Sequence, residues 1–525
     1  MALAALPRAP GVYVEWLDSN PQYLEVRRTD VAGFIGIAER GPLHAAIKLE
    51  SMRQFVTTFG DFTEQAYLAH AVEGFFSNGG RTCWVVRVAD PLKASLARLR
   101  LELPNGKTVV LESSSAGAWG NGISIEPIWG RDEVVALNVT ERDRSQRINL
   151  QAPEEGSSVS LTDPQRTLLG LPASALPELG LGVLVNRLNE ENKKTLLPVF
   201  VTSKLREIFL AGGSDGLDSL GATHFTGNPD ANPTRLWGID ALDRVDGVSF
   251  IAAPDLMGIG LAGSEVREAQ GAILGRCIAR GDRIAILDMP NVERDEALKY
   301  RRDLPETSFG ALYYPWICVD DPLRIHGTIR AIPPSGHVAG MFARTDRLRG
   351  VHKSPANEPL EGVWDLSHRI DAPAHAELNE NGVNGILAMP GRGVLVMGAR
   401  TLDRDPLWRY VNVRRLFAMI EEELDEQMQW LTFEPNNPRL WKEVDRAIRG
   451  FLERLYGAGM LDGATSDEAY FVHCDETTNP PSGTDEGRVV CEIGIQPPYP
   501  AEFVIVRVGV TRNGTRIEEK VAQSG

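Results

Sequence analysis

Three apolar segments decide the fold: GVSFIAAPD at residues 247–255, DRIAILDMP at 282–290 and SFGALYYPWICV at 308–319. Each is short and almost continuously apolar, which is typical of a strand buried on both faces of a sheet. Residues 265–280 and 294–302, which separate these segments, have the length and pattern of helices. Strands that alternate with helices predict a mainly parallel sheet with helices on its faces, in which residues 308–319 form one long strand.

The same alternation occurs nearer the start of the chain. Ser51 and Gln54 have the spacing of a capping box, which marks the first turn of a helix, and Gly60 lies just beyond the helix end. The order strand, helix, helix, strand assigns residues 31–93 to the same α/β core. The expected elements are a strand within residues 30–42, a helix between Ser51 and Gly60, a helix at 64–77 and a strand at 82–88.

The pattern of the sequence changes after this part of the core. Between residues 94 and 205, strand-length pieces such as KTVVLES and NGISIEPIW alternate with Gly, Asn and Ser turns, and helix periodicity is weak. The expected fold class is therefore α/β and α+β multidomain, with a β-rich insertion. The expected divisions are an extended N-terminal segment at 1–30, an α/β core formed by 31–93 together with 206–398, the insertion at 94–205 between these two stretches, a C-terminal α+β domain at 399–500 and a terminal segment at 501–525.

A strongly patterned helix is expected at residues 406–431, with Asp405 as N-cap and Pro406 at the first helical position. Its apolar residues recur at steps of three and four, which predicts one buried stripe. A second helix is expected at residues 438–456.

The charges along the first of these helices oppose its dipole. Arg409, Arg414 and Arg415 lie in its first half, whereas five acidic residues lie between Glu421 and Glu426. The helix dipole favours the opposite order by roughly 0.3–1 kcal/mol per charge near the ends. Two interpretations remain open: the arginines pair with nearby acids at the surface, or they contact an acidic partner.

Residues 502–511, EFVIVRVGVT, form an alternating β-rich segment behind the proline-rich QPPYP at 496–500. We identify no obvious partner strand for it within the chain. An unpaired strand is a template for pairing with another molecule. The presence of this segment therefore indicates a protein that assembles with other chains rather than an enzyme.

The composition excludes several classes of protein. The 525 residues carry a formal net charge of −16, which argues against a general attraction to nucleic acid or to an anionic membrane. No run approaches 18 apolar residues, and the first residues lack the pattern of a secretory signal. The five cysteines are scattered and never spaced as CxxC, so neither a disulfide framework nor a zinc site is expected. We expect a chain without cofactors in a reducing cytoplasm.

Signals for nucleophilic catalysis are weak. The GSDG at residues 213–216 is not a nucleophile elbow, because GxSxG is absent. Asp365, Ser367 and His368 are close in sequence, which says little about a triad in space. An α/β hydrolase-like or nucleotide-binding enzyme with a β-rich accessory domain remains the alternative, with Ser214 and Ser367 as the serines to test.

Signals for phosphate or metal binding are equally weak. The glycines of residues 390–400 lack the spacing of a phosphate-binding loop and do not open a helix after a strand. His473, Cys474 and Asp475 are consecutive, and consecutive strand residues point to opposite faces. A turn leading into a strand and a strand with a buried cysteine are the simpler interpretations.

Motifs along nearly the whole chain, in the expected order between about residues 10 and 510, resemble one family. It is that of the contractile tail sheath proteins of myophages, R-type tailocins and phage-like contractile injection systems. Residues 125–205 match least. The motifs are PGVYVEW, VAGFIGIAERGP, SMRQFVTTFG, AVEGFFSNGGRTCWVVRV, SAGAWGNGISIEP, LAGGSDG, DGVSFIAAPDL, GVLVMGARTL, WRYVNVRRLFAMIEEEL, FEPNNPRLWKEV and FLERLYGAGML.

The resemblance implies a structural protein rather than an enzyme. Such subunits form stacked hexameric rings around an inner tube and contract to drive the tube through a target envelope. The implied partners are further copies of the chain, the tube protein, and baseplate and tail-terminator proteins, with neither nucleic acid nor membrane insertion. The implied core is subtilisin-like without the protease triad, and the insertion faces outward. Assembly is implied in the bacterial cytoplasm, within a phage tail or a tail-like particle.

The resemblance also implies roles for particular residues. Terminal arms add strands to a sheet in neighbouring subunits, and that sheet maps to parts of residues 470–475 and 487–495. The tube-facing element maps to the helix at 406–431, with Arg409, Arg414 and Arg415 as its contacts. The implied arm residues are Val12, Tyr13, Val14 and Glu15 at one end, and Phe503, Val504, Ile505, Val506, Arg507 and Val508 at the other.

Overall fold

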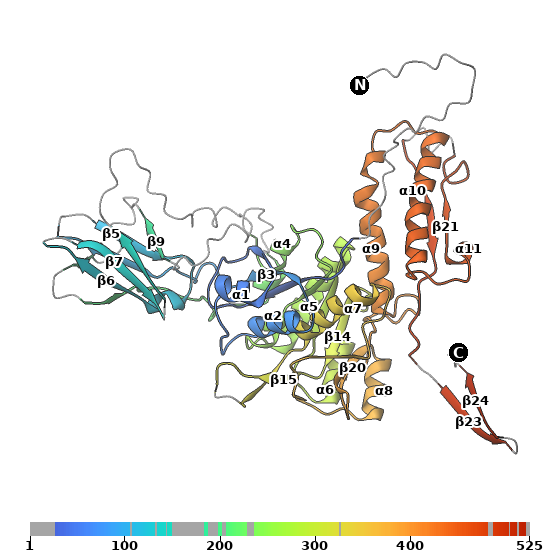
Figure 1. Cartoon of the computed structure of the whole chain (residues 1–525), viewed down its shortest axis with the longest axis horizontal. Helices are drawn as coiled ribbons and strands as arrows, with labels where there is room; N and C mark the ends of the chain where they lie inside the picture. Colours follow the sequence, from blue (N-terminus) through green and yellow to red (C-terminus); the bar gives the residue numbers. More distant parts are fainter. Residues whose placement is uncertain are drawn as a thin grey trace, which may run out of the picture. The chain divides into compact units, whose positions relative to one another are not determined.

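The computed structural model describes residues 27–104, 108–131, 134–142, 144–149, 183–186, 198–201, 206–227, 236–324, 327–480, 487–502, 505–511 and 514–520 (Figure 1). Two compact units divide these residues. The central unit comprises the described residues of 27–422 and 498–520, and the small unit comprises those of 423–497.

A nine-stranded sheet forms the core of the central unit, and its six middle strands, from β19 to β3, are parallel. The outer strands β2, β20 and β17 pair antiparallel. The prediction of a mainly parallel sheet is confirmed. In spatial order the strands are β17 Glu358–Pro359, β20 Gly393–Val396, β19 Val383–Met389, β14 Gly310–Tyr314, β13 Ile284–Asp288, β12 Phe250–Ala252, β1 Val31–Gly36, β3 Thr82–Arg87 and β2 Ala46–Leu49.

Successive side chains of the parallel strands pack into two separate cores, because side chains alternate between the faces of a sheet. Phe34, Phe250 and Tyr313 belong to one core, whereas Ile35, Ile251 and Leu312 belong to the other. Helices cover both faces. The first core is covered by α1 Met52–Phe59, α2 Leu68–Ser77 and α7 Ser335–Arg349, and the second by α3 Thr223–Thr226, α4 Ile239–Leu242, η4 Pro254–Met257, α5 Gly263–Arg280, α6 Arg294–Arg302 and α8 Ala372–Glu380.

Two sequence expectations are wrong in detail. Residues 308–319 do not form one strand, because β14 ends at Tyr314 and Pro315 has no N–H to continue the ladder. The chain then enters a second sheet, in which β15 Ile317–Asp320 lies between β16 Ile329–Ile332 and β18 Asp365–Leu366. The helix expected at 64–77 begins only at Leu68.

Between residues 98 and 209, the described elements are strands apart from one turn of 3-10 helix, η1 Ala118–Gly122. They form two four-stranded sheets that share a small apolar core of their own. One sheet contains β10 Pro198–Phe200, β4 Arg98–Glu102, β5 Thr108–Ser113 and β9 Val183–Asn186. The other contains β11 Ile208–Phe209, β6 Ile123–Trp129, β7 Val134–Glu141 and β8 Arg144–Asn149.

The small unit is built on α10 Pro438–Gly457, which confirms the helix expected at 438–456. Asn437 caps it by accepting hydrogen bonds from two backbone N–H groups of the first turn. Its buried side chains, from Leu440 to Leu455, recur at helical spacing and form one stripe. The unit also contains η5 Gln429–Leu431, α11 Ser466–Ala469, and the antiparallel pair β21 Tyr470–His473 and β22 Glu492–Ile495. None of the described helices is both long enough and apolar enough to cross a bilayer.

Helices α2 and α7 pack closely, and their contact encloses two buried histidines. A side chain on Gly336 or Gly340 would collide with the backbone of α2, so both positions require glycine. His70 lies on α2 and His337 on α7, and the Nδ1 atom of each has no hydrogen-bond partner among the described residues. Burial lowers the pKa of His70 to about 4 and the pKa of His337 to about 3, and Arg330 adds to the effect on His70.

These histidines predict a dependence of stability on pH. The unfolded chain takes up their protons near pH 6.5, whereas the folded chain resists until about pH 4, so stability falls as the pH drops through this window. Each histidine contributes a slope of about 1.4 kcal/mol per pH unit. We expect the free energy of unfolding of the wild type to fall about 2.7 kcal/mol per pH unit more steeply than that of the His70→Gln, His337→Gln double variant. Urea titrations between pH 6.5 and 4.5 measure this difference, and parallel curves for the two proteins would contradict it.

Candidate assembly elements

Residues 400–410 form a closed loop rather than the start of a helix. An isolated β-bridge joins Arg400 to Tyr410, and the backbone N–H of Thr401 donates to the carbonyl of Arg409 at 2.7 Å. Asp405 accepts from the N–H of Leu407 inside this loop. The expected helix start at Asp405-Pro406 is therefore wrong. Helix α9 comprises Val411–Gln427, because the residues before it form the loop that the β-bridge closes.

Arg415 lies on α9 and is buried in the central unit, with 3% of its side chain exposed. Its guanidinium binds both carboxylate oxygens of Asp346 on α7, and it also donates to the carbonyl of Thr29 at 2.9 Å. The rings of Phe250 and Phe342 lie within 5.3 Å of the guanidinium carbon. The guanidinium of Arg415 is thus buried and bound by residues of its own chain, which contradicts the expectation that it contacts a tube.

Arg414 is also buried, which contradicts the same expectation for this residue. Its guanidinium lies 4.6 Å from the ring centroid of Phe309 and 4.7 Å from that of Trp408, and it pairs with Glu421 at 2.9 Å. The conflict between the arginines and the helix dipole is thereby explained, because acids of the same chain compensate both buried charges. Arg409, which precedes α9, is partly exposed and remains a predicted contact.

The first described residues are tied to α9 by charged contacts. Arg27 forms an ion pair of 2.9 Å with Glu422 on α9. The hydroxyl of Thr29 donates to Asp346 at 2.7 Å, so Thr29 and Arg415 share one buried carboxylate. Residues 27–30 thus lead into β1 from a fixed point beside α9, which we call the N-terminal root.

A second set of contacts fixes residues 498–502, the C-terminal root. Arg400 forms a two-pronged ion pair with Glu502, to which Tyr410 also donates a hydrogen bond of 3.2 Å. Burial opposes ionisation of Glu502, but the hydrogen bonds from Arg400 outweigh it and hold the pKa of Glu502 below its ordinary value. The side-chain amide of Asn412 donates to the carbonyl of Pro498 at 3.0 Å. We call residues 400–422, which hold both roots, the anchor segment.

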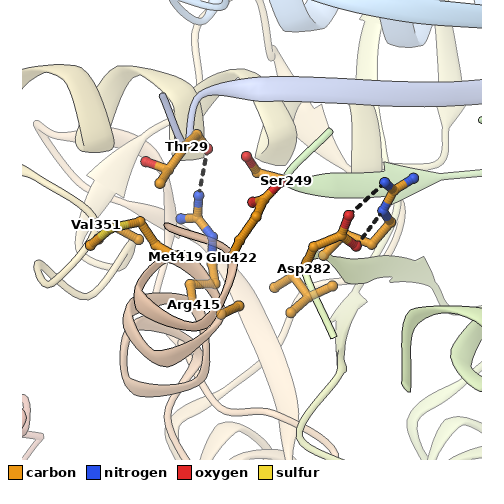
Figure 2. Close-up of a pocket in the computed structure, with 10 residues that line it drawn as sticks. Thr29, Ser249, Asp282, Val351, Arg415, Met419 and Glu422 are labelled. Atoms are coloured by element: carbon orange, nitrogen blue, oxygen red, sulfur yellow. Dashed lines mark hydrogen bonds and ion pairs between the residues drawn. The ribbon is translucent and has the colours of Figure 1, made fainter. Parts of the chain in front are cut away.

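Figure 2 shows the small pocket beside the N-terminal root, where Arg415 points toward Thr29 and Asp282 pairs with the neighbouring arginine. Thr29, Ser249 and Asp282 lie one or two residues before β1, β12 and β13, so this pocket lies at the amino ends of the parallel strands. Ligands of open α/β sheets bind instead at the carboxyl ends of the strands. The pocket is therefore a packing gap next to the anchor segment rather than a substrate site.

The structure does not assemble the candidate triad. Asp365 accepts from the adjacent backbone N–H of Leu366, whereas His368 approaches Asn291 at 3.1 Å. The hydroxyl of Ser367 has no hydrogen-bond partner among the described residues. Ser214 accepts a hydrogen bond from a nearby backbone N–H in a turn.

The phosphate and metal candidates are structural as well. Residues 390–392 connect the antiparallel strands β19 and β20, and no helix follows them. Asp475 accepts hydrogen bonds from the N–H and the hydroxyl of Thr477. The described residues contain no cluster of His, Cys, Asp and Glu that could hold a metal ion.

Much of the two expected arms lies outside the described residues: Val12, Tyr13, Val14, Glu15, Phe503 and Val504. Ile505, Val506, Arg507 and Val508 lie in β23 Ile505–Thr511, which pairs antiparallel with β24 Gly514–Lys520. The expectation that this segment has no partner within the chain is therefore wrong. Asn513-Gly514 between two alternating runs is a strong hairpin signal, and it could have revealed this pairing from the sequence.

The residues expected to receive the arms form β21 and β22, which pair only with each other among the described strands. Such a pair leaves two outer edges. It also brings Cys474 and Cys491 together, as the residues that directly follow the last paired residues, His473 and Glu492. Sequence spacing alone could not reveal this pair, because it depends on the register of the two strands.

Two family models match adjacent regions of the chain. The phage tail sheath protein central domain matches residues 238–402, and the phage tail sheath C-terminal domain matches residues 403–511. Together they cover more than half of the 525 residues. The boundary between them falls inside the anchor segment.

Curated relatives carry the same description. The tail sheath protein of Salmonella phage ViI is 26% identical over 237 residues, which are 43% of this chain and 36% of the relative. That of Vibrio phage KVP40 is 24% identical over 293 residues, or 54% and 40%. A putative prophage major tail sheath protein of Pseudomonas aeruginosa (strain UCBPP-PA14) is 27% identical over 284 residues, or 52% and 69%. The matched regions span less than half the length of the two phage relatives.

Solved structures share the fold over almost the full chain. The contracted helical sheath of the anti-feeding prophage matches with a TM-score of 0.58 and 22% identity, covering 97% of this chain and 100% of that chain. The contracted sheath complex of the extracellular contractile injection system PVC matches with a TM-score of 0.56 and 21% identity, covering 97% and 99%. The predicted mixed α/β multidomain fold is confirmed at this level.

Breaking the buried ion pair of the N-terminal root should lower the free energy of unfolding far more than breaking an exposed ion pair. Asp346→Asn leaves the guanidinium of Arg415 buried without its counter-charge, which costs about 3–5 kcal/mol. Glu443→Gln removes an ion pair with Arg439, whose side chain is 88% exposed, and should cost less than about 1 kcal/mol. Urea denaturation of both variants measures the difference. Equal losses would show that the buried pair does not hold the anchor segment.

Proposed function

Because this chain belongs to the phage tail sheath family, we propose that it polymerises around an inner tube as the sheath of a contractile phage tail or tail-like injection system. The observation that carries the proposal is the ordered match of two sheath domain models over residues 238–511. The likeness of fold to sheath subunits in contracted particles supports it. In this role the chain is a mechanical protein and not an enzyme.

We further propose the finer arrangement. Copies stack as hexameric rings in a helical array, made in the bacterial cytoplasm, with baseplate and tail-terminator proteins at the ends. The core, residues 31–93 and 206–398, is a subtilisin-like scaffold without catalytic function. The insertion at 94–205 faces outward, the domain at 399–500 faces the tube, and residues 1–30 and 501–525 act as arms.

The arms connect neighbouring copies by strand addition. The outer edges of the β21–β22 pair offer backbone groups to strands from other subunits. One backbone hydrogen bond contributes a net ~0.5–1.5 kcal/mol, so five bonds contribute roughly 3–7 kcal/mol. A single junction is therefore modest, and repetition over many subunits provides the strength of the polymer.

The two roots explain how an arm can transmit force to the body of its own subunit. Both are held by the anchor segment, through Asp346 and Arg415 at one end and through Arg400 and Glu502 at the other. Breaking a buried ion pair costs about 3–5 kcal/mol, which is comparable to the strand that the arm adds to a neighbour. A root of this strength therefore resists a pull on its arm about as well as the junction does.

If residues 505–520 act as an arm, their removal should abolish assembly without affecting the folding of the chain. A chain truncated after residue 504 loses β23 and β24 but keeps the Glu502 contacts, so its thermal midpoint should match that of the full chain. It should form no sheath tubes in negative-stain images. Truncation after residue 520 is the matched control and should form tubes at the yield of the full chain. Intact tubes from the 504 truncation would refute the arm assignment.

Arg409 is the remaining predicted tube contact, since Arg414 and Arg415 are buried. Arg409→Glu should reduce the number of sheathed tubes severalfold without changing the thermal midpoint, because the side chain is partly exposed. Arg439→Glu, at a more exposed position on α10, is the charge-matched control and should not reduce sheathed tubes. Equal numbers of sheathed tubes for wild type, Arg409→Glu and Arg439→Glu would show that Arg409 is only solvated.

A further inference from the structure

Two of the five cysteines meet at the end of the β21–β22 ladder. The last pair of this ladder is His473 opposite Glu492, so the next residues along the two strands, Cys474 and Cys491, face each other. The two thiols are near enough for each to influence the pKa of the other. Directly opposed residues of an antiparallel pair have Cα atoms about 4.5–5.5 Å apart, within the range that a disulfide spans.

The backbone pattern places this pair at a position without ladder hydrogen bonds. The N–H of Gln496 donates to the carbonyl of Ala469 at 2.8 Å, which makes that pair a hydrogen-bonded one. Hydrogen-bonded and non-hydrogen-bonded pairs alternate along an antiparallel ladder. Counting from Ala469 to Cys474 gives a non-hydrogen-bonded pair, in which opposed side chains lie closest together.

Asn479 holds the two strands together beyond the cysteines. Its side chain donates to the carbonyl of Val490 at 2.8 Å and accepts from the N–H of the same residue at 2.6 Å. Asn479 is 3% exposed, so these bonds are shielded from water. The register at Cys474 and Cys491 is thus fixed from both sides, by the ladder and by Asn479.

The other three cysteines are placed differently. Cys83 on β3 and Cys277 on α5 belong to cores on opposite faces of the large sheet, and both are fully buried. Cys318 lies on β15. Of the five, Cys491 is the one that is partly exposed to solvent.

We propose that Cys474 and Cys491 form a cross-strand disulfide when the chain meets a small-molecule disulfide such as oxidised glutathione. The Cys491 thiolate attacks one glutathione sulfur, which forms a mixed disulfide and releases one glutathione as a thiol. The Cys474 thiolate then attacks the sulfur of Cys491, which closes the protein disulfide and releases the second glutathione. Two protein thiols lose two electrons and two protons, and the small disulfide is reduced to two thiols.

The environment of the thiols makes this oxidation slow. Burial raises the pKa of Cys474, and burial together with Cys474 raises the pKa of Cys491 to about 12. Thiolate, the attacking species, is therefore scarce near neutral pH. The pair stays reduced in a reducing compartment and oxidises only after long exposure to oxidising surroundings.

The consequence for the particle rests on the proposed function. A two-stranded sheet is only marginally stable alone, and this one is the proposed receiver of the arms. A disulfide across it prevents β21 from separating from β22 when an arm pulls on either strand. The bond thus strengthens a released particle at the sheet on which its junctions depend.

The test uses the purified full chain, reduced and then incubated with oxidised glutathione, with free thiols counted in denaturant. The wild type should fall from five thiols to three, and peptide mapping should recover one linked pair, Cys474 with Cys491. Cys318→Ser, the matched control, should fall from four to two. Cys474→Ser should trap a glutathione adduct on Cys491, whereas Cys491→Ser should keep four thiols because Cys474 is buried.

Backbone hydrogen exchange supplies a second measurement on the same samples. Exchange in β21 and β22 should slow at least tenfold on oxidation of the wild type and stay unchanged in Cys491→Ser. Five remaining thiols in the wild type, a linked pair that includes another cysteine, or a disulfide between chains would overturn the proposal. These measurements use the dispersed chain, so a failure to form sheath tubes would count against the proposed function alone.

Discussion

The buried ion pair between Arg415 and Asp346 is the contact on which the position of the N-terminal root depends. It joins α9 to α7, and through Thr29 it also fixes the residues that lead into the first strand of the large sheet. Two aromatic rings and the low exposure of both side chains shield it from water. A buried charge pair of this kind is weak as a source of net stability, but it is costly to break by removing one partner. It therefore specifies one geometry for the N-terminal root.

The C-terminal root is also held by an arginine that binds a carboxylate, but the residues are different. Arg400 and Tyr410, which close the loop before α9, both bind Glu502. The two ends of the central unit are thus fixed to one stretch of chain, the anchor segment. In the proposed polymer, whose arms join neighbouring copies, this arrangement would transmit load to the large sheet rather than to a loop. The small unit supplies the complementary element, a two-stranded sheet with outer edges to offer.

The sequence predicted the elements whose pattern is local. The alternation of apolar strands with helices correctly predicted the parallel sheet, and the helix expected at residues 438–456 is present as α10. Predictions failed where tertiary contacts override local signals. Asp405-Pro406 has the signature of a helix start, yet the bridge between Arg400 and Tyr410 takes these residues into a loop. The burial of Arg414 and Arg415 could not be predicted from the sequence, because residues that contact them, such as Phe309 and Asp346, are distant along the chain.

The most direct test of the account is a cryo-electron microscopy reconstruction of the polymer at side-chain resolution. The account predicts that a strand from the arm of one subunit adds to the β21–β22 pair of a neighbour, while the contacts of Arg415 with Asp346 and of Arg400 with Glu502 persist in every subunit. A reconstruction in which both arms fold back onto their own subunit, with the outer edges of β21 and β22 free, would contradict it.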